Sequence, residues 1–140
     1  MKLEKFMCEV TKAILKDKKV LFWEYGDRIV ITHNLFFAMI ISKQINIFNH
    51  EFSKNNPIPC DWNSRKLKDT LLSTMIDKKL VHIFETEKGE KVHINEKYLN
   101  YFDKCSEFYG NSPKTPVFVS EDGGKNPCGI IMPIVKRGKK

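Results

Sequence analysis

The stretch PVFVSEDGGKNPCGIIMPIV, residues 116–135, decides how the chain ends. Two apolar runs, at 117–121 and 129–135, flank a polar segment that contains Gly-Gly. Apolar β-prone runs separated by a glycine turn are typical of a β-hairpin. The stretch therefore predicts that the chain closes with two antiparallel strands, the second of which ends in Met-Pro.

The N-terminal part reads as a helix followed by three strands. Apolar residues recur at spacings of three and four over 3–16, which predicts one buried helix face. The following strands are expected at 20–25, 28–33 and 35–42. The last of these is apolar at consecutive positions, so we expect both of its faces to be covered.

The middle of the chain predicts a loop, two helices and a hairpin. The proline-containing segment 53–62 is either a recognition loop or a tolerated insertion, and the residues leave this open. A second helix is expected at 64–78, with Leu67, Leu71, Leu72, Met75 and Ile76 as its apolar stripe. A hairpin is expected at 80–86 and 90–94, turning at Lys88-Gly89. A third helix is expected at 96–108, capped by Asn95 and burying Tyr98, Leu99, Phe102 and Cys105. This order of elements predicts an α+β fold.

Length and charge predict one domain, 1–135, with a basic tail at 136–140. The chain has 140 residues and a net charge of +7, of which the tail carries four positive charges. The body is thus only mildly basic, and the tail either touches phosphates or solvates the chain end. The four cysteines form no C-x-x-C pair, and neither a signal peptide nor a membrane-length apolar run is visible. We expect a soluble cytoplasmic protein with reduced thiols and no membrane partner. The tail residues are Lys136, Arg137, Lys139 and Lys140.

The sequence offers no frame for catalysis or for a bound metal. His82 and His93 lie in the two arms of one expected hairpin and could face each other, but nothing completes a zinc set. Cys128 sits in a turn-like NPCG context without a nucleophile elbow. EDGGKN lacks the P-loop frame. We therefore expect a protein that is not an enzyme and that uses neither a cofactor nor a metal.

One basic cluster could bind nucleic acid. Trp62 precedes Arg65, Lys66 and Lys68 at the start of the expected second helix. Cations beside an aromatic ring can follow a phosphate backbone while a base stacks on the ring. The alternative is a solvated helix face with a buried tryptophan. Cations are unfavourable at a helix N-terminus, so either a partner anion compensates or the helix start is misassigned.

Four segments resemble a DNA sliding-clamp domain. INEKYLNYFDKC (94–105), PVFVSEDGG (116–124) and GIIMPIV (129–135) are similar to the last helix, the acidic strand and the terminal strand of a bacterial clamp. YGDRIVITHNLFFAMI (25–40) is similar to a clamp hairpin. The resemblance implies a clamp-like α+β domain of antiparallel sheets with two to three helices, as in small phage or mobile-element proteins. A clamp ring needs six such domains, and this chain has the length of one.

The resemblance also implies a candidate binding site. In bacterial clamps the terminal Met-Pro strand borders a groove for partner peptides, and Met132, Pro133 and Ile134 match that motif. Alternatively, these are core or edge-strand residues, with Pro133 protecting the sheet edge. We expect the chain to be a phage or mobile-element interaction protein that binds a host or phage protein. In its most specific form, this expectation is an anti-CRISPR-like inhibitor of a host defence nuclease. A replication or processivity accessory factor that binds DNA is the alternative, and the oligomeric state is open.

Overall fold

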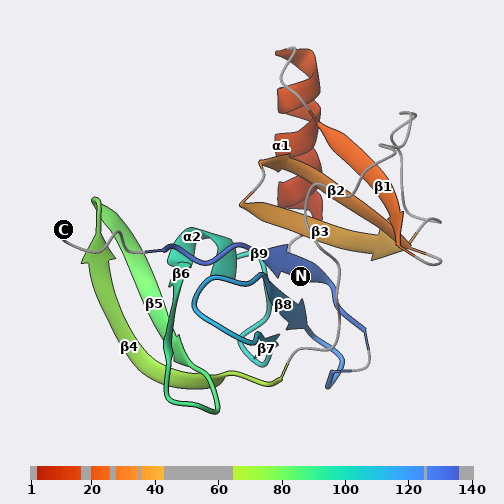
Figure 1. Ribbon diagram of the computed structural model, residues 1–140. Helices are drawn as coiled ribbons and strands as arrows, with labels where there is room; N and C mark the ends of the chain where they lie inside the picture. The colour runs from red at the N-terminus through yellow and green to blue at the C-terminus, as the bar shows by residue number, and fades with distance from the viewer. Residues whose placement is uncertain are drawn as a thin grey trace.

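The described part of the chain folds into two antiparallel sheets and two helices, which confirms the α+β expectation (Figure 1). The computed structural model describes residues 3–16, 20–25, 28–34, 36–42, 65–124 and 126–135. Its elements are α1 (Leu3–Leu15), β1 (Leu21–Tyr25), β2 (Arg28–Asn34), β3 (Phe37–Ser42), β4 (Lys68–Ile76), β5 (Lys79–Glu85), β6 (Lys91–Asn95), α2 (Glu96–Leu99), β7 (Glu107–Tyr109), β8 (Val117–Ser120) and β9 (Gly129–Ile131).

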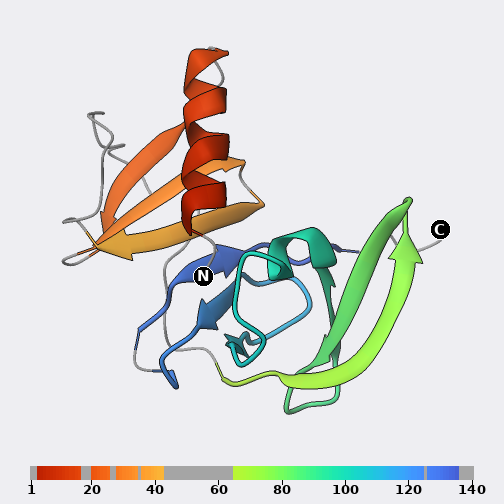
Figure 2. The same cartoon turned by 180° about the vertical axis from the view of Figure 1, so that it is seen from behind.

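The larger sheet has a symmetrical strand order, β1-β2-β3-β9-β8-β7. In each half, a helix precedes three strands that pair in sequence. The third strands of the two halves, β3 and β9, meet antiparallel at the centre, with Phe37 opposite Ile131. The smaller sheet, β4-β5-β6, is inserted between the two halves of the chain and lies to one side of the body (Figure 2).

The N-terminal expectations are confirmed. Phe6 and Val10 of α1 are completely buried, as the spacing of apolar residues predicts. All five residues from Phe37 to Ile41 of β3 are at most 2% exposed, so both faces of this strand are covered. Alternate β3 side chains belong to two different apolar clusters, one on each face of the sheet.

An aromatic cluster joins α1, β3 and the segment around α2. The ring of Phe37 stacks on Tyr98 and Tyr101, with centroids 4.9 Å apart in both cases. Phe6 and Phe102 contact the same ring edge-on, at 5.7 and 5.9 Å. Such pairs stabilise a core by roughly 0.5–1.5 kcal/mol each beyond their burial. The cluster therefore fixes α2 against the centre of the larger sheet.

The expected second helix is wrong, because most of this segment forms strand β4. Asp77 and Lys78, with φ of 49° and 64°, form a two-residue turn that leads into β5. Two left-handed residues suit the tight turn that joins hairpin strands. Once this turn forms, pairing with β5 satisfies the backbone hydrogen bonds of the segment. The apolar stripe of the expected helix then does not form a buried face. Leu71, Leu72 and Met75 are instead exposed.

The expected third helix is much shorter than 96–108. Asn95 caps it as predicted, since its side chain accepts a hydrogen bond from the Lys97 N–H at 3.2 Å. The helix ends at Leu99, and the chain then turns so that 107–109 can pair with β8 as strand β7. Cys105, which we expected to be buried, is exposed.

The two predicted hairpins are confirmed, with one shortened strand. β5 and β6 pair around the turn at 86–90, and β8 pairs with β9 across the turn that contains Gly123 and Gly124. β9 ends at Ile131 rather than at 135. The expected loop 53–62 and the tail 136–140 lie outside the described residues. Among the described residues, no helix is both long and apolar enough to cross a membrane.

Candidate functional site

A groove of about 650 Å³ lies where the chain leaves β9. The residues that follow β9 line one side, α2 and its cap line another, and single residues before β3 and at the start of β5 complete the wall. Its volume falls in the range of sites that bind small molecules or short peptide segments. The lining residues are Phe36, Lys79, Asn95, Lys97, Tyr98, Met132, Pro133, Ile134 and Val135.

Two backbone hydrogen bonds hold the terminal segment between the two sheets. The Met132 N–H donates to the carbonyl of Phe36 at 2.8 Å, beside the larger sheet. Two residues later, the Ile134 N–H donates to the carbonyl of His93 in β6 at 2.7 Å. Pro133 lies between them and has no N–H to satisfy. The segment thus bridges the sheets with its backbone paired on both sides of the proline.

The α2 wall of the groove is fixed from within the core. Tyr98 is 7% exposed and stacks on Phe37 beneath the helix. The Lys97 ammonium lies 5.0 Å from the centre of the Tyr98 ring, a distance that suits a cation–π contact. Both residues follow the Asn95 cap, which starts the helix at this edge of β6. The wall is therefore preformed.

The lining combines exposed apolar side chains with positive charge. Phe36 is 61% exposed and Val135 is 51% exposed, which is high for large apolar residues. Among the described lining residues, Lys79 and Lys97 are the charged ones, and none is a carboxylate. Such a surface favours a ligand with apolar side chains and a negative charge.

The structure brings Met132, Pro133 and Ile134 together in this groove. Met132 and Ile134 are half-buried, and Pro133 is buried. The alternative that they belong to an edge strand is wrong, because β9 lies between β3 and β8 and these residues follow its end. Pro133 therefore guards no edge of β9. The other part of the alternative, that the segment contributes to the core, holds for Met132. Its side chain packs against the apolar cluster formed by Val30, Ala38, Ile40, Phe118 and Ile130.

The described residues of the predicted basic cluster each lie near a carboxylate. Arg65 and Lys66 precede β4 and Lys68 begins it, so the puzzle of cations at a helix start came from a misassigned helix. Arg65 Nη1 lies 2.6 Å from Glu87 Oε2, and Lys66 Nζ lies 3.6 Å from Glu107 Oε1.

The third basic residue of this cluster, Lys68, also has an acidic neighbour. The hydrogen bond from Lys91 and, to a smaller extent, the charge of Lys68 hold the pKa of Glu85 below its usual value. A phosphate would have to compete with carboxylates at all three basic residues, 65, 66 and 68. Trp62 and the tail residues Lys136, Arg137, Lys139 and Lys140 lie outside the described residues.

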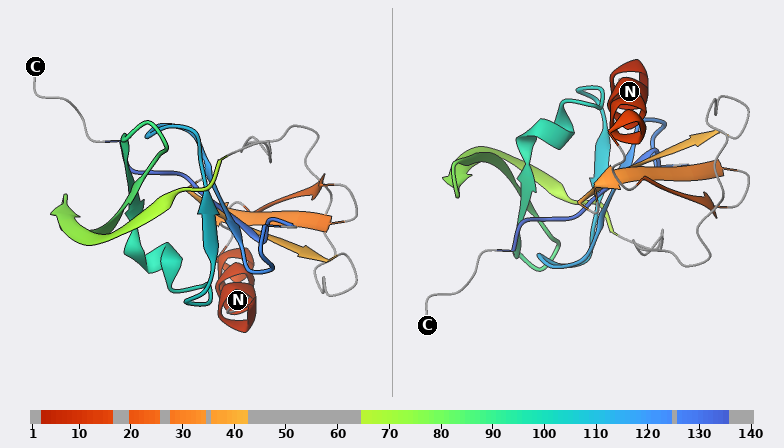
Figure 3. Two further views of the ribbon diagram at one scale, coloured as in Figure 1. Left: turned by 90° about the horizontal axis from the view of Figure 1, so that it is seen from below. Right: turned by 90° about the horizontal axis from the view of Figure 1, so that it is seen from above.

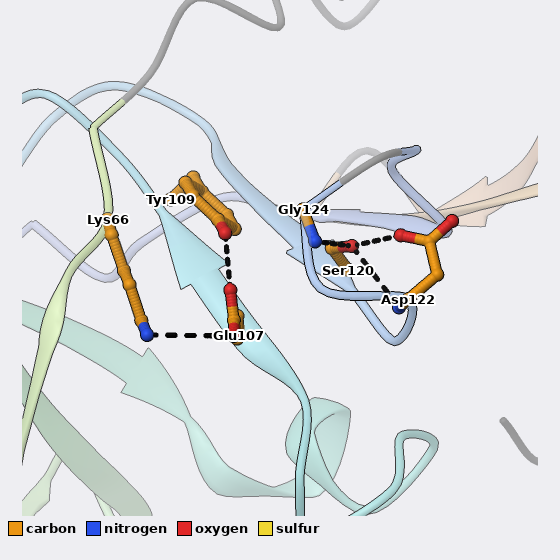
Figure 4. Close-up of polar contacts among 6 residues, drawn as sticks. All are labelled: Lys66, Glu107, Tyr109, Ser120, Asp122 and Gly124. Atoms are coloured by element: carbon orange, nitrogen blue, oxygen red, sulfur yellow. Dashed lines mark hydrogen bonds and ion pairs between the residues drawn. The ribbon is translucent and has the colours of Figure 1, made fainter.

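The acidic residues near β7 and β8 serve the fold (Figure 4). Glu107 accepts a hydrogen bond from the Tyr109 hydroxyl, which raises the pKa of Tyr109 to about 12. The buried Ser120 hydroxyl donates to Asp122 Oδ1 at 2.7 Å and accepts from the Gly124 N–H at 3.0 Å. These contacts shape the turn between β8 and β9, so its carboxylates are engaged in structure.

The two candidate metal ligands do not face each other, and the candidate nucleophile is buried. His82 pairs with Ile94 and His93 with Ile83, which puts the two imidazoles on opposite faces of the sheet. His82 Nε2 instead contacts Asp69 Oδ1 at 2.6 Å. The described residues contain no group of three or more potential metal ligands. Burial raises the pKa of the Cys128 thiol to about 12, which keeps it protonated and unreactive at neutral pH.

The chain matches no protein-family model, and no curated protein or solved structure matches it either. The groove must therefore be interpreted from its own residues. Six of its lining residues were not predicted as site residues from the sequence: Phe36, Lys79, Asn95, Lys97, Tyr98 and Val135. The apolar pair Phe36-Phe37 was the one available signal, but only the register of β3 distinguishes the exposed ring from the buried one.

Proposed function

We propose that this chain is a non-enzymatic interaction protein whose groove binds a short segment of a partner protein. The observation that carries the proposal is the lining of the groove: exposed Phe36 and Val135 lie together with Lys79 and Lys97 around the Met132–Ile134 segment. A partner segment with apolar anchors and an adjacent acidic side chain fits this chemistry. Peptide recognition of this kind relies on a preformed pocket for a few anchor side chains.

The scaffold of this proposal is a sliding-clamp-like domain. Two helices combined with an all-antiparallel six-stranded sheet agree with that resemblance, and so does a groove at the Met-Pro terminus. In its most specific form, the partner is a host defence nuclease and the chain is a phage or mobile-element inhibitor. This form predicts a stoichiometric complex that depends on the groove.

A selection from a displayed library of short random peptides tests the proposal. We expect the selected peptides to share two or more apolar residues and at least one acid. Their affinity should fall at least about tenfold, roughly 1.4 kcal/mol, in Phe36→Ala and in Lys97→Glu. Lys104→Glu, on an exposed turn away from the groove, is the matched charge control. Peptides that bind all three variants equally, or a selection that yields no binder, would refute the proposal.

A further inference from the structure

The β4–β5 hairpin exposes an apolar surface that does not belong to the groove. It projects from the body beside the larger sheet (Figure 3). Four large apolar side chains on it are about half exposed or more, although such residues are normally buried. By the register of β4 and β5, Met75 and Leu80 lie opposite each other on one face of the hairpin and Leu72 lies on the other face. The four are Leu71 at 82%, Leu72 at 60%, Met75 at 61% and Leu80 at 49%.

The outer edge of β4 is also open. β4 is the end strand of its sheet, and within the described part of the chain nothing pairs with its outer side. Proteins usually protect such edges with a charge, a proline or a bulge. The irregularity in β4 is confined to residues 69–72, and residues 72–76 contain neither a charge nor a proline. The outer half of this edge therefore lacks protection against pairing.

The turn fixes which backbone groups point outward. Ile76 and Lys79 close the two-residue turn, and hydrogen-bonded pairs alternate along an antiparallel ladder from there. By this alternation the backbone groups of Thr74 face β5, whereas those of Ser73 and Met75 face outward. The outward-facing backbone groups of Ser73 and Met75 can therefore form hydrogen bonds with the same groups of a second copy. The two copies would be related by a two-fold axis that passes beside Thr74.

The two ends of the hairpin carry mixed charges, Lys68 and Asp69 at the foot and Asp77, Lys78 and Lys79 at the tip, and the axis places the acid of one end near lysines of the other. Asp69 lies at the foot of β4, with its side chain 46% exposed, and Lys78 and Lys79 lie exposed at the tip. A two-fold axis through the centre brings the foot of one copy beside the tip of the other, twice. Parallel pairing would instead place the like-charged tips together.

We propose that β4 pairs antiparallel with β4 of a second copy, so that the chain forms a two-fold symmetric dimer. Ser73 of each copy lies opposite Met75 of the other, and Leu72 lies opposite Ile76. The two β4 strands then make one continuous six-stranded sheet, in which Leu72 packs beside Ile76 of the other copy on one face and Met75 packs beside Ser73 on the other face. The apolar residues of this interface do not line the groove, whereas Lys79 at the hairpin tip lies in both.

Cross-linking tests the register. Thr74 faces itself across the axis in a non-hydrogen-bonded pair, whose Cα atoms lie about 4.5 Å apart. That distance suits a disulfide. We expect Thr74→Cys to form a covalent dimer under mild oxidation, with position 74 identified in both linked peptides by mass spectrometry. Asp77→Cys is the control, because its two copies are roughly 20 Å apart in this register. Equal cross-linking of both variants would overturn the proposal.

Light scattering across a range of concentrations tests the dimer itself. We expect the mass of the full chain to rise from one to two subunits, and the double variant Leu72→Lys/Met75→Lys to remain monomeric at every concentration. Leu15→Lys, on the exposed side of α1 at 80% exposure, should dimerise normally. A wild-type chain that stays monomeric, or self-association that survives the double variant, would overturn the proposal.

Discussion

The ring of Phe102 lies directly on the Cα of Gly129. A Cβ at this position would lie 2.8 Å from Phe102 Cε1 and closer still to Cζ, which real Cβ atoms essentially never do. Gly129 begins β9, and Phe102 follows α2 in the aromatic cluster around Phe37. The missing side chain therefore lets α2, one wall of the groove, pack against the centre of the larger sheet.

Gly129→Ala should consequently destabilise the fold. Overpacking of a buried site costs about 1–3 kcal/mol, and we expect a loss in this range from denaturant unfolding. The double variant Gly129→Ala/Phe102→Leu should recover part of the loss, because the smaller side chain makes room for the methyl group. If the losses of unfolding free energy from the two substitutions simply add, the methyl group does not clash with Phe102.

Phe36 and Phe37 are neighbours that should respond in opposite ways to substitution by alanine. Phe37 is 2% exposed at the centre of the aromatic cluster, so Phe37→Ala should cost about 3–5 kcal/mol of unfolding free energy. Phe36 lines the groove and is 61% exposed, so Phe36→Ala should change stability by about 0.5 kcal/mol or less. Chemical denaturation of both variants checks this. A large destabilisation by Phe36→Ala would mean that its ring is structural.

The sequence predicted best where one local pattern had one physical solution. Phe6 and Val10 share a helix face whatever the rest of the fold. Five consecutive apolar residues in β3 must be buried on both faces of the sheet. It failed at β4, because the leucines at 71 and 72 fit a helical stripe as well as a strand. The difference came from Asp77-Lys78, a turn whose partner strand lies in the next segment. Pairing between segments is a tertiary effect that local periodicity does not contain.

The same limit applies to the candidate site. The Met132–Ile134 motif could be found from the sequence, since it is one continuous stretch. Lys79 and Lys97 could not be found, because they reach the groove from β5 and α2 only after both sheets form. The ion pairs of the basic cluster could not be predicted for a related reason, because the acids that pair with Arg65 and Lys66 lie 22 or more positions away in the chain.

Cys128 should resist thiol reagents in the folded protein. Burial raises the pKa of its thiol to about 12, so very little thiolate is present near pH 8. Cys8 and Cys105 are exposed. Iodoacetamide labelling followed by peptide mass spectrometry should therefore modify these two before Cys128, and denaturant should abolish the difference. Early labelling of Cys128 would contradict its buried position just before β9, where its backbone pairs with β3 and β8.

Acid should weaken the contact that joins β7 to the start of β4. The hydrogen bond from Tyr109, together with the charge of Lys66, holds the pKa of Glu107 below its ordinary value of 4.5. A lowered carboxyl pKa stabilises the folded state above the unfolded pKa, and this contribution is lost as the pH falls through the folded pKa.

Urea midpoints measured from about pH 7 down to pH 3 test this linkage. Glu107→Gln should lose less stability than the wild type over that range, because it has no carboxyl group to protonate at this position. Glu90→Gln, in the exposed turn of the β5–β6 hairpin, is the control and should follow the wild type. An unchanged acid profile in Glu107→Gln would mean that the Tyr109 contact does not stabilise the fold.

The most direct test of the groove is a map of backbone amide chemical shifts on adding a selected peptide. The proposal predicts that shifts concentrate at positions 36, 79, 95–98 and 132–135, and that Lys97→Glu weakens them while Lys104→Glu does not. Shifts centred on β4, or on the segment around Arg65 and Lys66, would contradict it, because the peptide would then bind elsewhere on the molecule.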